Sequence, residues 1–345
     1  MEKIKQIFSS KRNLVFTAVV ALLILIPVMM ENNIIFKQSK YVYLLLCLIG
    51  IYTIATSGLD IVFGYTGQIS FGHAGFFCIG AYGSVLLSHS EWGLGKYMGV
   101  TLPPLASILT AAVLAAVIGA LLAFPASKLV FHFLSLLTIA FNQLMLLVVA
   151  NFAGLTNGYV GITRVPQISI FGFSFNTVSS KYNYYFLVLF FVILFLIIKE
   201  NIVHSRIGRG FIAIRENVMA ANGCGVNIKS YKIMSFAISA FYVGFAGGLY
   251  AHMVGFISPD TFVQNTSVIF ITMLLFGGSG NLAGPIIGAA VITVIQEGLQ
   301  SLSDYRMLVY GIFILIIILF QPQGISGLSK DISGFIRRSG GGKRA

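Results

Sequence analysis

The chain contains few residues that could do chemistry, and their spacing fits no common catalytic motif. The Gly-Lys pairs at 95–96 and 342–343 are not part of the Gly-x4-Gly-Lys-Ser/Thr sequence that cradles nucleotide phosphates. The sequence has no His-Glu-x-x-His, no Gly-x-Ser-x-Gly and no pair of carboxylates inside an apolar stretch, so protease and lipase chemistry lack their residues. Cys47, Cys78 and Cys224 have the spacing of neither metal ligands nor a disulfide framework. We therefore expect no enzyme, no metal and no cofactor in this chain.

Ionisable residues near apolar stretches are the other chemical candidates, because ion-coupled carriers usually keep several such groups at membrane depth. We interpret Asp60 as a helix-end residue at the membrane interface, and Glu297 as a partner in a structural pair. His73, His132 and His252 are isolated from one another, and we expect them to be satisfied hydrogen-bonding residues rather than a proton relay.

A basic stretch at residues 205–226 has a different pattern. The apolar residues that recur at helical spacing on one face are Phe211, Ile214, Val218 and Ala221. Arg215 and Glu216 lie beside this face, and Gly223 and Gly225 follow as residues that can end a helix. We expect a short amphipathic helix that docks into a groove on a cytoplasmic partner. The alternative is a helix on the lipid surface, but about 12 residues with small alanines bury little apolar area.

The composition indicates the kind of fold that positions these candidate residues. Of 345 residues, 57% are hydrophobic and 9% are charged, against roughly a quarter charged in an ordinary soluble domain. Ten crossing helices of about 20 residues would use ~200 residues. The sequence therefore excludes a soluble protein and predicts an all-α, polytopic integral membrane protein.

We predict about ten transmembrane helices. They lie at residues 14–30, 41–57, 74–90, 104–124, 129–150, 182–198, 233–252, a stretch ending near 276, a stretch running to about 302, and 307–320. We interpret the first as a retained anchor rather than a cleaved signal peptide, because no small-x-small site follows it.

The basic residues predict an orientation. The net charge is +12, and most Lys and Arg residues lie in segments on one side of the predicted spans, which favours N-inside and C-inside without nucleic acid. Residues 1–345 are read as a single transmembrane domain, with a cytoplasmic coupling loop at residues 199–232 within it.

Two uncharged runs are too long for single helices. Residues 61–90 would make a helix of roughly 45 Å and residues 261–296 one of roughly 54 Å, against a hydrocarbon core of about 30 Å. We expect a broken or re-entrant segment at Ile61–His73, buried in protein, where freed backbone groups can find partners. We place a tight connection at 277–285, where Gly and Pro interrupt the helix.

Several spans carry small residues four positions apart. These residues are Ala111, Ala115, Gly119 and Ala123 on one span, and Ala240, Gly244 and Gly248 on another. Such stripes let helix backbones approach closely, and we expect packing within the subunit rather than a dimer face.

Three segments in order resemble the permease subunits of ATP-binding-cassette importers for branched-chain amino acids, the high-affinity LIV type. The segments are GLDIVFGYTGQISFGHAGFF at 58–77 followed by 80–82, AIREN at 213–217 with 220–221 and 225–226, and ISPDTF at 257–262 with GGSGNLAGP at 277–285. One departure is Asp60, where the family is expected to have a neutral Asn.

The resemblance implies a pore-forming subunit in the bacterial cytoplasmic (inner) membrane. Its implied partners are a second similar permease, two cytoplasmic ATPase subunits that bind ATP, and an extracytoplasmic solute-binding protein. The residues expected to couple this chain to the ATPases are Ala213, Arg215, Glu216, Asn217, Ala220, Ala221 and Gly225. The residues expected to line or gate the translocation path, at the two breaks, are Gly64, Gly67, Gln68, Ser70, Gly72, His73, Gly277, Gly278, Gly280, Gly284 and Pro285.

Other transport functions stay open at this point. Importers for urea or short amides share these features, and an ion-coupled secondary carrier can also contain broken helices. A passive channel is a third class, in which the Gly-rich breaks would be filter loops. Dependence on ATP and on the coupling helix separates the importer from the other two.

Overall fold

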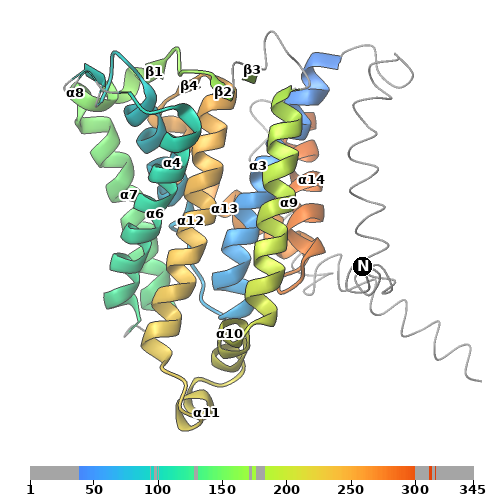
Figure 1. Cartoon of the computed structure of the whole chain (residues 1–345). Coiled ribbons are helices and arrows are strands. Elements are labelled where there is room, and N and C mark those ends of the chain that lie inside the picture. Colours follow the sequence, from blue (N-terminus) through green and yellow to red (C-terminus); the bar gives the residue numbers. More distant parts are fainter. Residues whose placement is uncertain are drawn as a thin grey trace, which may run out of the picture.

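The computed structural model describes residues 39–93, 95–96, 99, 101–127, 131–170, 173–175, 183–299, 311–312 and 315. Long helices stand roughly side by side, with α10 (Arg206–Glu216) and α11 (Val218–Gly223) at one end, which we call the coupling end (Figure 1). The short helix α8 (Ala153–Thr156) and the small strands lie at the opposite end. The predicted spans at 14–30 and 307–320 lie outside the described residues, apart from three positions in the second.

Five described helices are long and apolar enough to cross a membrane, because each offers an uncharged stretch that satisfies its own backbone hydrogen bonds. They are α3 (Ser39–Asp60) with its continuation to Tyr65, α6 (Pro104–Ala126), α7 (Phe131–Asn151), α9 (Asn183–His204) and α12 (Ile228–Val254). Three further apolar helices are shorter. They are α4 (His73–Ser88), α13 (Gln264–Gly277) and α14 (Ala283–Gly298). The chain is therefore a mostly helical, multi-pass membrane protein.

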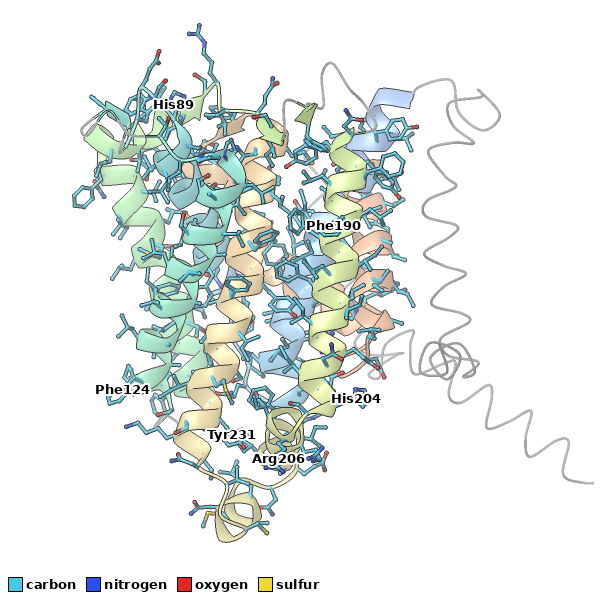
Figure 2. All side chains as sticks on the ribbon, viewed as in Figure 1. His89, Phe124, Phe190, His204, Arg206 and Tyr231 are labelled. Atoms are coloured by element: carbon cyan, nitrogen blue, oxygen red, sulfur yellow. The ribbon has the colours of Figure 1, made fainter. Side chains whose placement is uncertain are left out.

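Large apolar side chains cover the outside of the bundle. Leu121 on α6 is 67% exposed and Phe190 on α9 is 60% exposed, and Figure 2 shows Phe124 at the outer edge of the helices. So many exposed large apolar side chains are unusual for a soluble monomer and are typical of a surface that contacts lipid or a partner.

The centre of the bundle is α12, which packs against α3, α4 and α6. The two stripes of small residues face each other across α6 and α12: a Cβ on Gly119 would lie 2.6 Å from the Cβ of Ala240, and one on Gly244 would lie 2.6 Å from the Cβ of Ala115. The predicted packing of these stripes within the subunit is confirmed. Small residues suit this role because lipid offers no hydrophobic drive for helix association, so close backbone contact must supply the attraction.

Short strands tie the loops together at the end opposite α10 and α11. Strand β1 (Ile162–Thr163) pairs antiparallel with β4 (Phe256–Ile257), and β2 (Ile168–Ile170) pairs antiparallel with β3 (Phe173–Phe175). The 3-10 turn η2 (Gly158–Val160) lies in the same loop. The long connection between α7 and α9 is thereby fixed to the far end of α12.

Both predicted breaks are present. Helix α3 continues as one π-helical turn, η1 (Ile61–Tyr65), and residues 66–72 then run without helical structure from the coupling end toward the middle of the bundle (Figure 1). The chain does not return to the coupling end, because α4 continues to the opposite end, where the His89 ring lies 3.3 Å from the backbone oxygen of Thr163. The segment is thus a broken crossing rather than a re-entrant loop.

The second predicted break is the connection at residues 278–282 between α13 and α14, and the segment that leads into α13 comes from the opposite end of the bundle. After α12, the strand β4 and the 3-10 turn η3 (Pro259–Phe262) lead into α13, which ends at Gly277 near the coupling end. Helices α4 and α13 are therefore half-length helices that begin inside the bundle and run in opposite directions. Their first turns touch: the backbone N–H of Ala74 donates to Ser267 Oγ at 2.8 Å.

Candidate coupling and translocation site

Helix α10 is held against its own bundle. Ser205 caps its start by accepting hydrogen bonds from the backbone N–H groups of Ile207 and Gly208. Phe211 is fully buried, in edge contact with the ring of Tyr231, and Ile214 is 2% exposed; Figure 2 places Tyr231 beside α10. The prediction that this apolar face docks on a partner is therefore wrong, because α9 and α12 already cover it.

The predicted single amphipathic helix is also wrong, because Asn217 interrupts it. Its backbone is extended, with φ −158° and ψ 110°, and its side chain accepts hydrogen bonds from the backbone N–H groups of Met219 and Ala220, which starts α11. Ala221 is buried within the chain itself, but Val218 is exposed, because the break rotates α11 away from the buried face. Helix α11 instead projects from the bundle with Met219 82% exposed.

Arg215 is exposed overall, but the end of its side chain reaches the bundle. Its guanidinium donates a hydrogen bond to the backbone carbonyl of Gly64 in η1, and its side chain also lies against Gly67 and Gly280. One residue of α10 therefore touches both breaks. The other predicted coupling residues divide by exposure: Ala213 is half-buried and Ala221 buried, whereas Glu216, Asn217, Ala220 and Gly225 are exposed.

Asp60 and Lys199 form an ion pair inside the protein. Lys199 Nζ lies 2.7 Å from Asp60 Oδ2, and both side chains are 0% exposed. Asp60 does end α3, but it is not an interface residue, because α9 covers it. Lys199 is not in the predicted loop, since α9 continues to His204. The pairing was missed in the sequence, although both charges end predicted spans on the same side of the membrane.

The same pair holds the connection between α13 and α14. The backbone N–H of Gly280 donates to Asp60 Oδ1 at 2.7 Å, and Lys199 Nζ donates to the carbonyl of Asn281 at 3.3 Å. Helices α3, α9 and α10 and the α13–α14 connection therefore meet at one point. We call the residues Asp60, Gly64, Lys199, Arg215 and Gly280 the coupling-end cluster.

The α13–α14 connection is packed too tightly for side chains. A Cβ on Gly277 would overlap the carbonyl of Gly284, and one on Gly284 would overlap the carbonyl of Gly278. Gly278 and Gly280 have φ of +98° and +74°, which favour glycine. Pro285 belongs to the same contact, because its carbonyl accepts from Thr56 Oγ1 at 3.4 Å.

Two polar side chains of this segment, Gln68 and His73, turn toward α12. Gln68 Nε2 donates to Ser235 Oγ at 3.1 Å, and the His73 ring bridges Ser70 Oγ at 3.1 Å and Ser239 Oγ at 2.7 Å. These contacts satisfy side chains that would be costly in lipid. Gly72 is required by close approach, because a Cβ there would lie 2.7 Å from the carbonyl oxygen of Thr138.

The same segment also has an accessible side. Residues 67, 69 and 71 are half-buried, whereas residues 68, 70 and 72 are buried. The residues of this segment are therefore alternately packed and partly accessible. The accessible side begins at Gly67, against Arg215, and reaches Phe71 in the middle of the bundle.

The other predicted chemical candidates have structural partners. Glu297 Oε2 accepts from the Tyr41 hydroxyl at 2.8 Å, and His252 Nδ1 lies 2.6 Å from the carbonyl of Pro166. The side chain of His132 lies outside the described residues. Within the described part of the chain, no three His, Cys, Asp or Glu residues gather as a metal site would need.

This fold and site define a class: a polytopic helical membrane protein in which one short helix at the end of the bundle contacts both breaks. Residues 41–318 match the family described as branched-chain amino acid transport system / permease component. The chain belongs to this family, whose members are transport permeases rather than enzymes, and the resemblance found in the sequence is confirmed.

Individual proteins similar to this chain are also named as branched-chain amino acid transport permeases. The chain is 30% identical over 300 residues to the high-affinity branched-chain amino acid transport system permease protein LivM of Escherichia coli, covering 81% of this chain and 68% of LivM. It is 26% identical to a probable LivM of Methanocaldococcus jannaschii, covering 80% and 90% of the two chains. It is also 26% identical to LivH of E. coli, covering 80% and 91%. No solved structure matches the chain.

Proposed function

We propose that the chain is a permease subunit of an ATP-binding-cassette importer for branched-chain amino acids in the bacterial cytoplasmic membrane. The LivM and LivH relatives are branched-chain amino acid transport permeases by name, which supports the substrate class. Because two kinds of permease occur among the relatives, we propose a second, similar permease as partner. Two cytoplasmic ATPases, which bind the ATP, and an extracytoplasmic solute-binding protein complete the proposed assembly.

The observation that carries the coupling role is the position of Arg215. Helix α11 offers the exposed Val218 and Met219 to an ATPase, and it follows α10 directly in the sequence, with only Asn217 between them. A rigid-body shift of these two helices would move the Arg215 guanidinium against the Gly64 carbonyl, and so move η1 relative to Gly280. An ATPase can drive opening of the path only if it contacts the permease differently in two conformations, and this difference is what couples the two.

We propose that residues 64–73 and 277–285 open and close the path. The path residues at both breaks, Gly64, Gly67, Gln68, Ser70, Gly72, His73, Gly277, Gly278, Gly280, Gly284 and Pro285, are close-packed or hydrogen-bonded in the present arrangement. Interfaces of this kind switch between discrete packings rather than deforming continuously.

The test is transport by the full complex in proteoliposomes. We expect leucine uptake that requires ATP and the binding protein. Arg215→Ala removes a charged donor worth about 1.5–3 kcal/mol, so leucine moved per ATP hydrolysed should fall about tenfold or more. The matched control is Arg206→Ala, an exposed arginine of the same helix, which should leave this ratio unchanged.

Two outcomes would contradict the proposal. If the purified chain alone accumulated solute from an imposed proton or sodium gradient, it would be a secondary carrier. If the complex transported urea or short amides but not leucine, isoleucine or valine, the substrate class would be wrong.

A further inference from the structure

The side of the bundle where α7 meets α13 carries an amide at membrane depth. Gln143 lies near the middle of α7, is exposed, and makes no hydrogen bond to any described residue. Its neighbours on that face are apolar, with Leu136 and Leu147 exposed as well. An unpaired amide that faces hydrocarbon costs free energy. The position of Gln143 therefore indicates that this face of α7 does not contact lipid.

Helix α13 brings more amides to the same depth. Asn142 Nδ2 donates to Gln264 Oε1 at 3.0 Å, which joins the middle of α7 to the first residue of α13. Gln143 and Asn265 are the next residues along the two helices, and both are exposed. We call Asn142, Gln143, Gln264 and Asn265 the mid-depth amide patch.

The start of α13 provides positive potential. The N-cap residue is Val263, which has no side-chain acceptor for the first-turn N–H groups. A helix N-terminus carries a partial positive charge that favours an anion such as a carboxylate, and broken helices in transporters use this.

A second observation points to a ligand at this helix start. Asn142 is fully buried, and its Oδ1 has no hydrogen-bond partner among the described residues. Buried polar atoms are nearly always hydrogen-bonded. The unpaired Asn142 Oδ1 beside Gln264 therefore indicates an acceptor whose hydrogen-bond donor comes from a bound ligand.

The patch also adjoins the accessible side of residues 67–71. Gln264 Nε2 donates to the carbonyl of Phe71 at 2.9 Å, so the half-buried Phe71 lies directly beside the amides. Val263 is 37% exposed at the same place. The accessible side of residues 67–71 therefore begins at Gly67, against Arg215, and ends at a site with both polar and apolar surface.

We propose that the mid-depth amide patch binds a passing α-amino acid and faces an aqueous path rather than lipid. The first turn of α13 and the amides of Gln143 and Asn265 donate to the carboxylate. Asn142 Oδ1 accepts from the ammonium group, and Phe71 and Val263 contact the apolar side chain. The inference rests on the proposed function, because only an amino acid substrate calls for these three contacts together.

The first experiment is uptake by the full complex carrying Gln143→Leu with Asn265→Leu. Both residues are exposed, so the double variant should assemble normally. We expect leucine moved per ATP to fall at least about tenfold, as expected for one or two lost hydrogen bonds to a charged group. Leu114→Ala, at mid-depth on the apolar face of α6, is the matched control and should keep the wild-type ratio.

The second experiment is thiol labelling in membranes with a membrane-impermeant maleimide. In a Cys224→Ser background, where the remaining Cys47 and Cys78 are buried, Gln143→Cys and Asn265→Cys should react and Leu114→Cys should not. Unreactive thiols at both patch positions, or an unchanged leucine-to-ATP ratio in the double leucine variant, would overturn the inference. Failure of the wild-type complex to transport branched-chain amino acids would instead overturn the proposed function.

Discussion

At the scale of single residues, the buried pair Asp60–Lys199 is the most consequential feature. Removing two charges from water is costly, and the pair is stable only because each partner keeps a second contact, to Gly280 and to Asn281. Such a pair adds little net stability compared with two well-packed apolar residues. It does fix how α3, α9 and the α13–α14 connection fit together.

Breaking the pair on one side should be far worse than removing both charges. Asp60→Asn or Lys199→Met alone leaves an uncompensated buried charge and should lower the free energy of unfolding by about 3–5 kcal/mol. The double variant Asp60→Asn with Lys199→Met should recover most of that loss. Denaturant unfolding of the purified chain in detergent measures both.

A control for this comparison is Arg206→Met, an exposed charge that should change stability by no more than about 0.5 kcal/mol. If the double variant were as unstable as the sum of the single variants, the two charges would not act as a pair.

At the scale of elements, glycine decides how closely α7 and α10 can approach the broken segment. Gly72→Ala would place a Cβ 2.7 Å from the carbonyl of Thr138, and Gly67→Ala would put a side chain at φ +69°, which costs about 1–2 kcal/mol. We expect both variants to assemble but to lose most leucine uptake, as measured in proteoliposomes.

Gly223→Ala supplies the comparison, since nothing lies within 4 Å of a Cβ there. It should leave uptake intact and favour the helical state of α11 by up to about 1 kcal/mol. Wild-type uptake in the Gly67 and Gly72 variants would show that the broken segment does not move during transport.

The break at Asn217 gives a separate prediction about α11. Asn217→Ala removes the acceptor for two backbone N–H groups and should destabilise this short helix by about 1 kcal/mol. Amide hydrogen exchange in residues 218–223 should become faster, and the affinity for the ATPase subunits should fall. Asn217→Ser keeps a capping oxygen and should preserve both; equal loss in the two variants would contradict a capping role.

At the scale of the whole molecule, the orientation in the membrane can be tested on the unmodified chain. Cys224 follows α11 and is exposed, whereas Cys47 and Cys78 are buried. If α10 and α11 face the cytoplasm, a membrane-impermeant thiol reagent should label inside-out vesicles and leave intact spheroplasts unlabelled. Cys224→Ser should abolish the signal. Labelling of intact spheroplasts through Cys224 would reverse the predicted topology.

The outside of the molecule limits what the chain can do alone. The exposed apolar side chains of α6, α7 and α9 suit lipid or another membrane subunit, and α11 offers Met219 to a partner outside the bundle. We therefore expect the chain to work only as part of an assembly.

The sequence by itself determined the elements and the breaks. Uncharged apolar stretches predicted α3, α6, α7, α9 and α12, because span length is set by the thickness of the hydrocarbon core. The polar, Gly-rich residues of 61–73 and 277–285 predicted interruptions, because a helix there would leave polar groups in lipid. These inferences succeed because each depends on neighbours within one segment.

Only the tertiary structure decided which of these segments touch. Asp60 and Lys199 are 139 positions apart, and Arg215 is 151 positions from Gly64, so no local periodicity encodes their pairing. The amphipathic pattern of residues 205–226 likewise predicted an apolar face but not what covers it. In the structure the apolar face of α10 is buried in the bundle, and the break at Asn217 directs α11 away from it. Long-range packing settles such choices, because the free energy of burying a charge or an apolar face depends on what covers it.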